Sequence, residues 1–348
     1  MFVSVIMPIY NGEAFLGEAI ESVLAQTHRN FELVAVDDGS TDASPAILAE
    51  FAAADRRVRV ITQRNGGGAR ARNRALQEAR ADWLINLDCD DVFLPNRIER
   101  QLAFLAACPE VKVFACRAFY INRTGKIFGQ TRCEPFTTRR EFERYYAAGL
   151  PLGINHSAVA MHRPTILAVG GYRSEFAGAE DLDLWNRVAE RGHLVLQQDE
   201  ALFKYRIHST SVMASRTRQS WEAGDWAIAC MQARRAGRPE PTREEFQRQL
   251  RARPWWRRLQ RERHMIARVH YRMAGLDIAH GHWPQGAARL AVASGAWPRY
   301  VAKRFAAQLY RPALAWWRGG GGQADEGRPR AAGAAASGRI NPPRSARP

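Results

Sequence analysis

The sequence predicts an α/β fold: a mostly parallel sheet flanked by helices, followed by an α-helical C-terminal region and a disordered tail. Short apolar runs rich in β-branched residues alternate with segments of helical spacing over residues 2–87. After Ser215 the composition shifts to Ala, Arg, Gln, Leu and Trp, and then to Gly, Ala, Arg and Pro. We therefore expect three parts, which are residues 1–215, 216–318 and 319–348.

The sheet is predicted from four apolar runs that each stop at a polar loop. Strands are expected over residues 2–9, 31–37, 58–62 and 83–87, with helices over 13–26, 43–54 and 69–80 between them. A sheet of this kind binds ligands at the C-terminal ends of its strands. The loops after Ile9, Val36 and Leu87 are therefore expected to form one site.

The C-terminal third carries the basic charge of the chain. The formal net charge is +16, and residues 216–318 hold 21 Arg and Lys against 7 Asp and Glu. Eight of the ten Trp also follow Ser215, on stretches that are expected to be helical. The tail from Gly319 has little apolar surface to bury, so disorder is expected there.

Cysteine usage and hydropathy favour a cytoplasmic protein. The five cysteines form no CxxC pair and are odd in number, which indicates neither a zinc site nor a disulfide framework. The first apolar run, residues 2–9, follows no basic segment and is too short for a signal peptide. No stretch of 18 apolar residues is present to span a bilayer.

The strongest chemical signal is Asp88-Cys89-Asp90-Asp91, which directly follows an apolar run. Three carboxylates so close together repel one another unless a cation lies among them. Oxygen ligands without clustered cysteines indicate Mg²⁺ or Mn²⁺, ions that commonly share their coordination with substrate phosphates. The alternative is a solvated acidic turn that caps a helix starting near Pro95.

Two further loops could contact a nucleotide. Asp37-Asp38 ends a strand and could place one carboxylate against a nucleobase or ribose, although its turn chemistry could also explain it. The glycine-rich segment 64–68 opens a helix that carries Arg70, Arg72 and Arg74, and amides at such a helix start bind anions. The GxGxxG spacing is absent, so a nicotinamide cofactor is not indicated.

Asp181 precedes a segment of helical spacing and has two interpretations. It could be a plain N-cap of that helix, or it could be a general base that faces the donor site.

The motifs together resemble family 2 glycosyltransferases over residues 2–211. Seven of them occur in the order and rough spacing of that family, which is far more specific than any one match. They are Pro8-Ile9-Tyr10-Asn11, Asp37-Asp38-Gly39-Ser40-Thr41-Asp42, Ala71-Arg72-Asn73, Asp88-Cys89-Asp90-Asp91, Gly170-Gly171, Glu180-Asp181 and Tyr205-Arg206-Ile207-His208 with Ser209 and Ser211.

The resemblance implies a GT-A (Rossmann-like) catalytic domain over residues 1–215, a UDP-, GDP- or dTDP-sugar donor and inversion at the anomeric carbon. It implies that Asp181 is the catalytic base and that Asp88, Asp90 and His208 bind the metal. His208 could equally be an ordinary loop histidine. The implied donor-binding residues are Pro8, Tyr10, Asn11, Glu13, Asp38, Arg72, Asp88 and Cys89.

The basic C-terminal third leaves two other functions open. Arginines interleaved with Trp suit a nucleic-acid-binding protein, but the charge is absent from the part with the carboxylate loops and no nucleic-acid motif is present, so no nucleic acid is expected. Paired tryptophans beside arginines also suit an anionic membrane surface. Membrane contact agrees with a lipid-linked or oligosaccharide acceptor and with cell-surface polysaccharide or glycolipid synthesis. The remaining interpretation is a solvated basic surface over a Trp-filled helical core.

Overall fold

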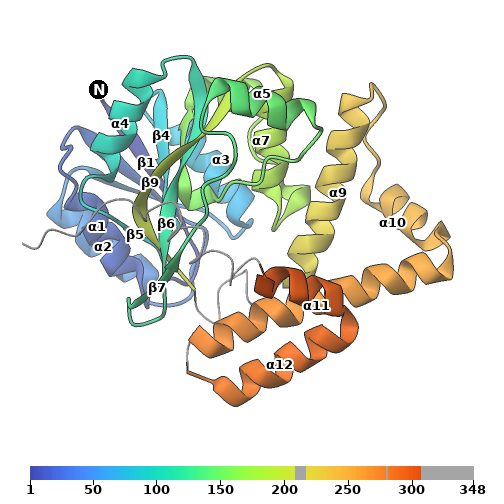
Figure 1. The fold of residues 1–348 in the computed structure, drawn as a ribbon. Coiled ribbons are helices and arrows are strands. Elements are labelled where there is room, and N and C mark those ends of the chain that lie inside the picture. Colours follow the sequence, from blue (N-terminus) through green and yellow to red (C-terminus); the bar gives the residue numbers. More distant parts are fainter. Residues whose placement is uncertain (208–216, 280, 307–348) are drawn as a thin grey trace, which may run out of the picture. The chain divides into compact units, whose positions relative to one another are not determined.

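The computed structural model describes residues 1–207, 217–279 and 281–306 (Figure 1). Residues 1–301 form one compact unit. The boundary predicted after Ser215, His208 and the tail from Gly319 lie outside the described residues.

Nine strands of the described residues form a single sheet, in the order β3-β2-β1-β4-β8-β6-β9-β5, with β7 paired to β6. The strands are β1 (Val3–Ile9), β2 (Phe31–Asp37), β3 (Val58–Thr62), β4 (Trp83–Asn86), β5 (Val92–Phe93), β6 (Val111–Ile121), β7 (Ile127–Gln130), β8 (Val159–His162) and β9 (Leu194–Arg206).

Helices precede, connect and follow the strands. They are α1 (Leu16–Leu24), α2 (Ser44–Ala54), α3 (Gly68–Glu78), α4 (Arg97–Ala107), α5 (Arg139–Ala147), α6 (Arg163–Ala168), α7 (Glu180–Glu190), α9 (Thr217–Arg235), α10 (Arg243–Ala252), α11 (Trp255–Ala279) and α12 (Trp283–Ala296), with short 3₁₀ turns η1 (His156–Ala158) and η2 (Ser174–Phe176).

The predicted α/β fold is confirmed, and the four predicted strands are β1 to β4. These four strands pair in parallel, as the alternation of strands and helices predicts. Beyond β4 the sheet is mixed, because β8 runs antiparallel to both β4 and β6, while β6 and β9 are parallel. Every residue of β2 is buried, which fits a central strand that is covered on both faces.

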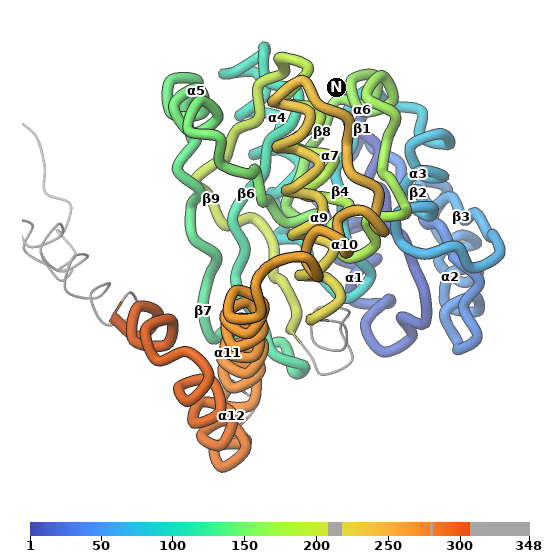
Figure 2. The backbone as a smooth tube through the Cα atoms, turned by 90° about the vertical axis from the view of Figure 1, so that its right-hand side faces the viewer, coloured from blue at the N-terminus to red at the C-terminus, as the bar shows by residue number. Residues whose placement is uncertain are grey.

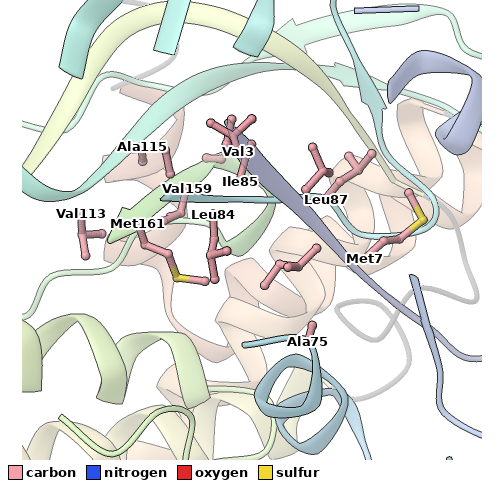
Figure 3. Close-up of a cluster of buried hydrophobic side chains, with 14 of the residues drawn as sticks. Val3, Met7, Ala75, Leu84, Ile85, Leu87, Val113, Ala115, Val159 and Met161 are labelled. Atoms are coloured by element: carbon pink, nitrogen blue, oxygen red, sulfur yellow. The ribbon is translucent and has the colours of Figure 1, made fainter. Parts of the chain in front are cut away.

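The main hydrophobic core lies against this sheet. Figure 3 shows Val3, Leu84, Val113 and Met161, which come from four different strands and point into one cluster. Helix α3 adds Ala75 to it, a small residue that lets the helix approach the sheet closely. The core thus holds the strand ends, and the loops that follow them, in fixed relative positions.

Helices α9 and α10 build a second, smaller hydrophobic cluster together with Phe176 of η2. Trp226 of α9 stacks on Phe176, with ring centroids 4.2 Å apart, and both belong to a second buried cluster that includes Phe246 of α10. Helices α11 and α12 lie side by side (Figure 2). None of the helices in the described part of the chain is long and apolar enough to cross a bilayer.

Candidate active site

The loop after β1 is joined to the loop after β2. The Asn11 amide donates to Ser40 Oγ at 3.0 Å, and Asn11 Oδ1 accepts from the Thr41 amide at 2.8 Å. The Glu13 amide donates to Asp42, while Glu13 Oε2 accepts from the Ala43 amide at 2.9 Å. Asn11 and Glu13, both predicted to bind the donor, therefore use their side chains to shape the loops.

Residues 8–11 form the turn that leaves β1. Asn11 has a φ of 51°, a conformation that Asn tolerates better than most residues. Pro8 lies in β1 opposite Val36, and Tyr10 is 52% exposed. Tyr10 is thus an exposed aromatic residue on this turn that could contact a ligand.

Asp38 provides the anion that the glycine-rich segment binds. Its carboxylate accepts from the amides of Gly66 at 2.9 Å and Gly67 at 2.7 Å, and from Gln63 Nε2 at 2.7 Å. These amides are predicted to bind an anion, and Asp38 is predicted to line the nucleotide pocket. In the structure the two features pair with each other at the start of α3.

The acidic segment after β4 is tied to α3 and to η1. Arg72 donates to Asp88 at 2.6 Å and also contacts Glu180 at 3.3 Å. The Asp88 amide donates to Ser157 Oγ at 3.2 Å. Repulsion within the segment is therefore relieved in part by the buried guanidinium of Arg72.

Asp91 is the fully buried member of the segment. Burial, with Asp90 and Asp88 nearby, holds its pKa well above the usual value. Its Oδ1 accepts from the Arg206 amide at 2.9 Å, and the Arg206 guanidinium donates to the Asp90 carbonyl. The segment does not cap α4, whose N-cap is Asn96.

Cys89 connects the acidic segment to the first loop. A Cβ built on Gly12 would lie 2.9 Å from Cys89 Sγ, so only glycine allows this approach. Burial, with Asp90 and Asp88 nearby, raises the pKa of the thiol well above its usual value.

Asp181 is the second residue of α7, whose N-cap is Ala179, so the interpretation as an N-cap is wrong. Its Oδ1 accepts from the Leu182 amide at 2.7 Å. Burial, and next the Glu180 carboxylate, raise the pKa of Asp181 to about 7. A carboxylate with this pKa can take up a proton near neutral pH, as a general base must.

His156 is a site residue that sequence reasoning missed. Its Nδ1 lies 3.7 Å from Asp181 Oδ2, and its ring packs against Tyr172 and Trp185. Its Nε2 is buried and has no hydrogen-bond partner within the described residues. Burial, then the charge of Arg72, hold the pKa of His156 well below 6.5, so the ring is neutral.

The predicted glycine pair makes the turn that positions Tyr172. Gly170 and Gly171 have φ values of 87° and 66°. The side chain of Asn73 of α3 makes two hydrogen bonds to the backbone of Tyr172. Its Nδ2 donates to the Tyr172 carbonyl at 2.7 Å, and its Oδ1 accepts from the Tyr172 amide at 2.8 Å. Arg187 of α7 donates to the Gly171 carbonyl at 2.6 Å. The turn thus links α3 to the helix that carries Asp181.

The acidic segment has the donor chemistry that Mg²⁺ or Mn²⁺ prefers. Asp88 and Asp90 offer carboxylate oxygens, and such ions are often held by one or two carboxylates together with substrate phosphates. No group of three or more His, Cys, Asp or Glu side chains converges on a metal position within residues 1–207, 217–279 and 281–306. His208, the predicted third ligand, lies outside these ranges.

The structure brings most of the predicted residues to one edge of the sheet. Arg72, Asp88 and Asp181 are linked through Glu180, and Cys89 joins them to the loop after β1. Asp38 instead faces the glycine-rich segment.

Three comparisons describe what this chain is similar to. Residues 4–167 match the family described as Glycosyl transferase family 2. EpsE of Bacillus subtilis, a predicted glycosyltransferase, is 35% identical over 211 residues, which are 60% of this chain and 73% of EpsE. The uncharacterized protein y4gI of Sinorhizobium fredii is 32% identical over 69% of this chain, which spans 26% of that protein.

The fold also has solved counterparts. The crystal structure of S. aureus TarS 1-349 in complex with UDP-GlcNAc has a TM-score of 0.54 at 17% identity, over 86% of this chain and 92% of that chain. TarS 1-349 in complex with UDP has a TM-score of 0.52 at 16% identity. At this identity, the likeness concerns the fold.

Proposed function

This chain belongs to glycosyltransferase family 2, and on that premise we propose that it moves a sugar from a nucleotide-diphosphate donor to an acceptor hydroxyl with inversion. The observation that carries the proposal is the contact network around Arg72. This buried arginine joins Asp88 of the acidic segment to Glu180, the neighbour of Asp181. One side chain therefore joins the proposed donor-phosphate region at Asp88 to Glu180, which adjoins the proposed base, Asp181, whose pKa is about 7.

The donor is proposed to enter at the edge formed by the loops after β1, β2 and β4. The exposed Tyr10 ring offers an aromatic face for a nucleobase. Asn11, Glu13 and Asp38 act indirectly in this proposal, because they hold the two loops and the glycine-rich segment that surround the nucleotide. The binding of UDP and UDP-GlcNAc by TarS supports this donor class, with GDP- and dTDP-sugars as the other candidates.

Asp88 and Asp90 are proposed to hold Mg²⁺ or Mn²⁺, with His208 as a further ligand. When bound, such an ion offsets the negative charge that develops on the departing nucleotide diphosphate. Arg72 supplies a fixed positive charge beside Asp88, which also favours a phosphate there.

Asp181 is proposed to take the proton of the acceptor hydroxyl as that oxygen attacks the anomeric carbon. The oxygen-to-carbon bond forms while the bond to the nucleotide phosphate breaks on the opposite face of the sugar. One displacement gives one inversion, and no enzyme nucleophile is required. The neutral His156 ring and the Leu182 amide limit how far the Asp181 carboxylate can turn.

The test is a screen of purified protein against UDP-, GDP- and dTDP-sugars with Mn²⁺ or Mg²⁺, measuring release of the nucleoside diphosphate. Excess chelator should abolish release, and Asp90→Ala should do the same because it removes a metal ligand. Asp88→Ala should weaken donor binding and turnover together. Full activity in chelator would overturn the metal-dependent mechanism, and no release from any donor would overturn the donor class.

A second proposal concerns the basic helices, which we infer to contact an anionic membrane surface on the cytoplasmic side. The observation that favours it is exposure: Trp255, Trp256 and Leu259 of α11 are 69%, 50% and 50% exposed. Large apolar side chains that are exposed beside arginines are typical of interfacial helices. Such contact would bring the site to a lipid-linked acceptor in polysaccharide or glycolipid synthesis.

A further inference from the structure

A pocket of about 350 Å³ lies between α9, α10 and the start of α11. None of its lining residues belongs to the sheet edge that carries Asp88 and Asp181. Seven arginines and two glutamates line it, together with the apolar side chains of Trp226, Phe246 and Leu250. The volume is at the small end of the range for ligand sites in proteins, roughly 300 to 1,000 Å³.

The acidic residues of the pocket already have arginine partners. Arg218 pairs with Glu222 at 3.1 Å and with Glu262 at 2.9 Å. Arg261 pairs with Asp225 at 2.9 Å.

The other five lining arginines have no carboxylate partner within the described ranges. Arg257 lies over the ring of Trp256, 5.0 Å from its centroid, and makes no ion pair there. Guanidinium groups gathered at one concave site repel one another unless an anion is present. The five are Arg243, Arg251, Arg253, Arg257 and Arg258.

The apolar side chains of the pocket are fixed by packing and by one hydrogen bond. Trp226 is buried, stacks on Phe176 and donates its indole N–H to the Pro241 carbonyl at 2.8 Å. Phe246 belongs to the same buried cluster, and Leu250 packs against it. The pocket therefore combines a packed apolar wall with positively charged side chains.

We propose that this pocket binds a phosphate ester or diphosphate, with the phosphate oxygens on the unpaired arginines and the organic part against Phe246 and Leu250. Guanidinium groups bind phosphate oxygens through paired N–H donors, which makes arginine better suited to this anion than lysine. Several arginines around one small volume match an anion that carries more than one charge. The proposal does not rest on the transfer reaction, so Asp181→Asn should leave this binding unchanged.

The experiment is titration calorimetry of the full chain with pyrophosphate in the presence of chelator, which removes metal-dependent binding at Asp88 and Asp90. The variant with both Arg251→Gln and Arg258→Gln should bind pyrophosphate at least tenfold more weakly. Arg248→Gln is the matched control, because Arg248 is exposed on the same helix as Arg251 but does not line the pocket. Circular dichroism of each variant checks the fold.

Equal pyrophosphate binding by the double variant and the wild type would overturn the proposal, as would an equal loss in Arg248→Gln. The source of the phosphate is identified by a second arm with phosphatidylglycerol vesicles. Loss of both pyrophosphate and vesicle binding in the double variant assigns a lipid headgroup, whereas loss of pyrophosphate binding alone assigns a soluble phosphate ester. Tight binding of a single-stranded oligonucleotide with no binding of pyrophosphate would contradict the assignment.

Discussion

Asp181 lies where burial and the adjacent Glu180 both disfavour its charged form, and this sets its pKa near 7. An acid whose pKa rises on folding lowers stability as pH increases from its unfolded pKa to its folded pKa. At pH 8 the ionised Asp181 therefore opposes folding. A residue that costs stability yet faces the site is more easily explained by catalysis than by structure.

Asp181→Asn should separate these two roles. Asn has nearly the same size and can still accept from the Leu182 amide, but it cannot take a proton. Turnover should fall by about 10²- to 10⁴-fold. The melting temperature at pH 8 should stay equal or rise, because the ionised carboxylate beside Glu180, which opposes folding at this pH, is gone. Donor affinity from calorimetry should be retained, and an Asn variant with near wild-type turnover would refute the base assignment.

The rate should depend on the ionisation of Asp181. Because the base must be deprotonated, kcat/KM should be flat above pH 7 and fall tenfold per pH unit below it. Glu180→Gln removes the like charge that faces Asp181. The fall in kcat/KM should then begin at a lower pH. Arg72 and the neutral His156 also face the carboxylate; Arg72 loses its ion pair with Glu180 in this variant, and its positive charge favours ionised Asp181, which acts in the same direction. A profile that is flat between pH 5.5 and 8 in the wild type would contradict the assignment.

Some site residues could not be predicted because only tertiary structure brings them to the site. Asp88 and Asp181 stand in recognisable local motifs. His156 follows no strand signal and reaches Asp181 only because η1 lies next to the end of β4. Arg206 was part of a recognised motif, but its bonds to Asp90 and Asp91 depend on β9 pairing with β5, more than a hundred residues earlier.

At the scale of secondary structure, the turn after α6 controls where α7 begins. Gly171 has a φ of 66°, and a Cβ there would lie 2.6 Å from Asn73 Oδ1. Gly170 has a φ of 87° but has no atom within 4 Å of such a Cβ. The two neighbours therefore differ in steric contact while sharing left-handed backbone.

Substitution of these glycines should reveal that difference. Gly170→Ala should cost about 1 kcal/mol through backbone strain. Gly171→Ala should cost about 1 to 3 kcal/mol more, because it also disturbs the bonds from Asn73 to Tyr172. Urea unfolding measures both, and turnover should fall further in Gly171→Ala because Tyr172 packs on His156. Equal destabilisation by the two variants would mean that the contact with Asn73 is unimportant.

The elements differ in how well the sequence predicts them. The strands β1 to β4 end within two residues of prediction because each is a short apolar run bounded by polar residues. The strands β6, β8 and β9 were not predicted, since their pairing joins segments far apart in the chain. Among the helices α9 to α12, α9 and α12 carry the least amphipathic sequences, so composition predicted helix but not packing.

At the scale of the whole molecule, the basic charge lies on helices that pack on the catalytic part through α9. Arg234 of α9 pairs with Glu190 at 2.5 Å and with Glu240 at 3.1 Å. Trp226 is buried at the same junction, as the interpretation of a Trp-filled core predicts. Trp255, Trp256 and Trp283 are exposed, so that interpretation does not extend to α11 and α12.

The exposed side chains of Trp255 and Trp256 should mediate membrane contact. Trp255 and Trp256 lie one turn before Leu259 on α11, so the three can insert together while Arg257 and Arg258 meet anionic headgroups. Each such arginine contributes about 1 kcal/mol near an anionic surface, and salt weakens it. The full chain should therefore float with phosphatidylglycerol vesicles at low salt and bind phosphatidylcholine vesicles poorly.

Replacing Trp255 and Trp256 with Ala should abolish flotation without lowering the melting temperature, because both side chains are exposed. Two single variants serve as controls. Trp283→Ala removes an equally exposed indole from α12 and should still float, while Trp226→Ala should unfold the junction, costing about 3 to 5 kcal/mol. If the Trp255 and Trp256 double variant lost stability, the pair would be packed in solution after all. If the wild type failed to float at low salt, the exposed side chains of Trp255, Trp256 and Leu259 would need a partner other than a lipid surface. Exposed apolar side chains that lie together commonly mark an interaction site.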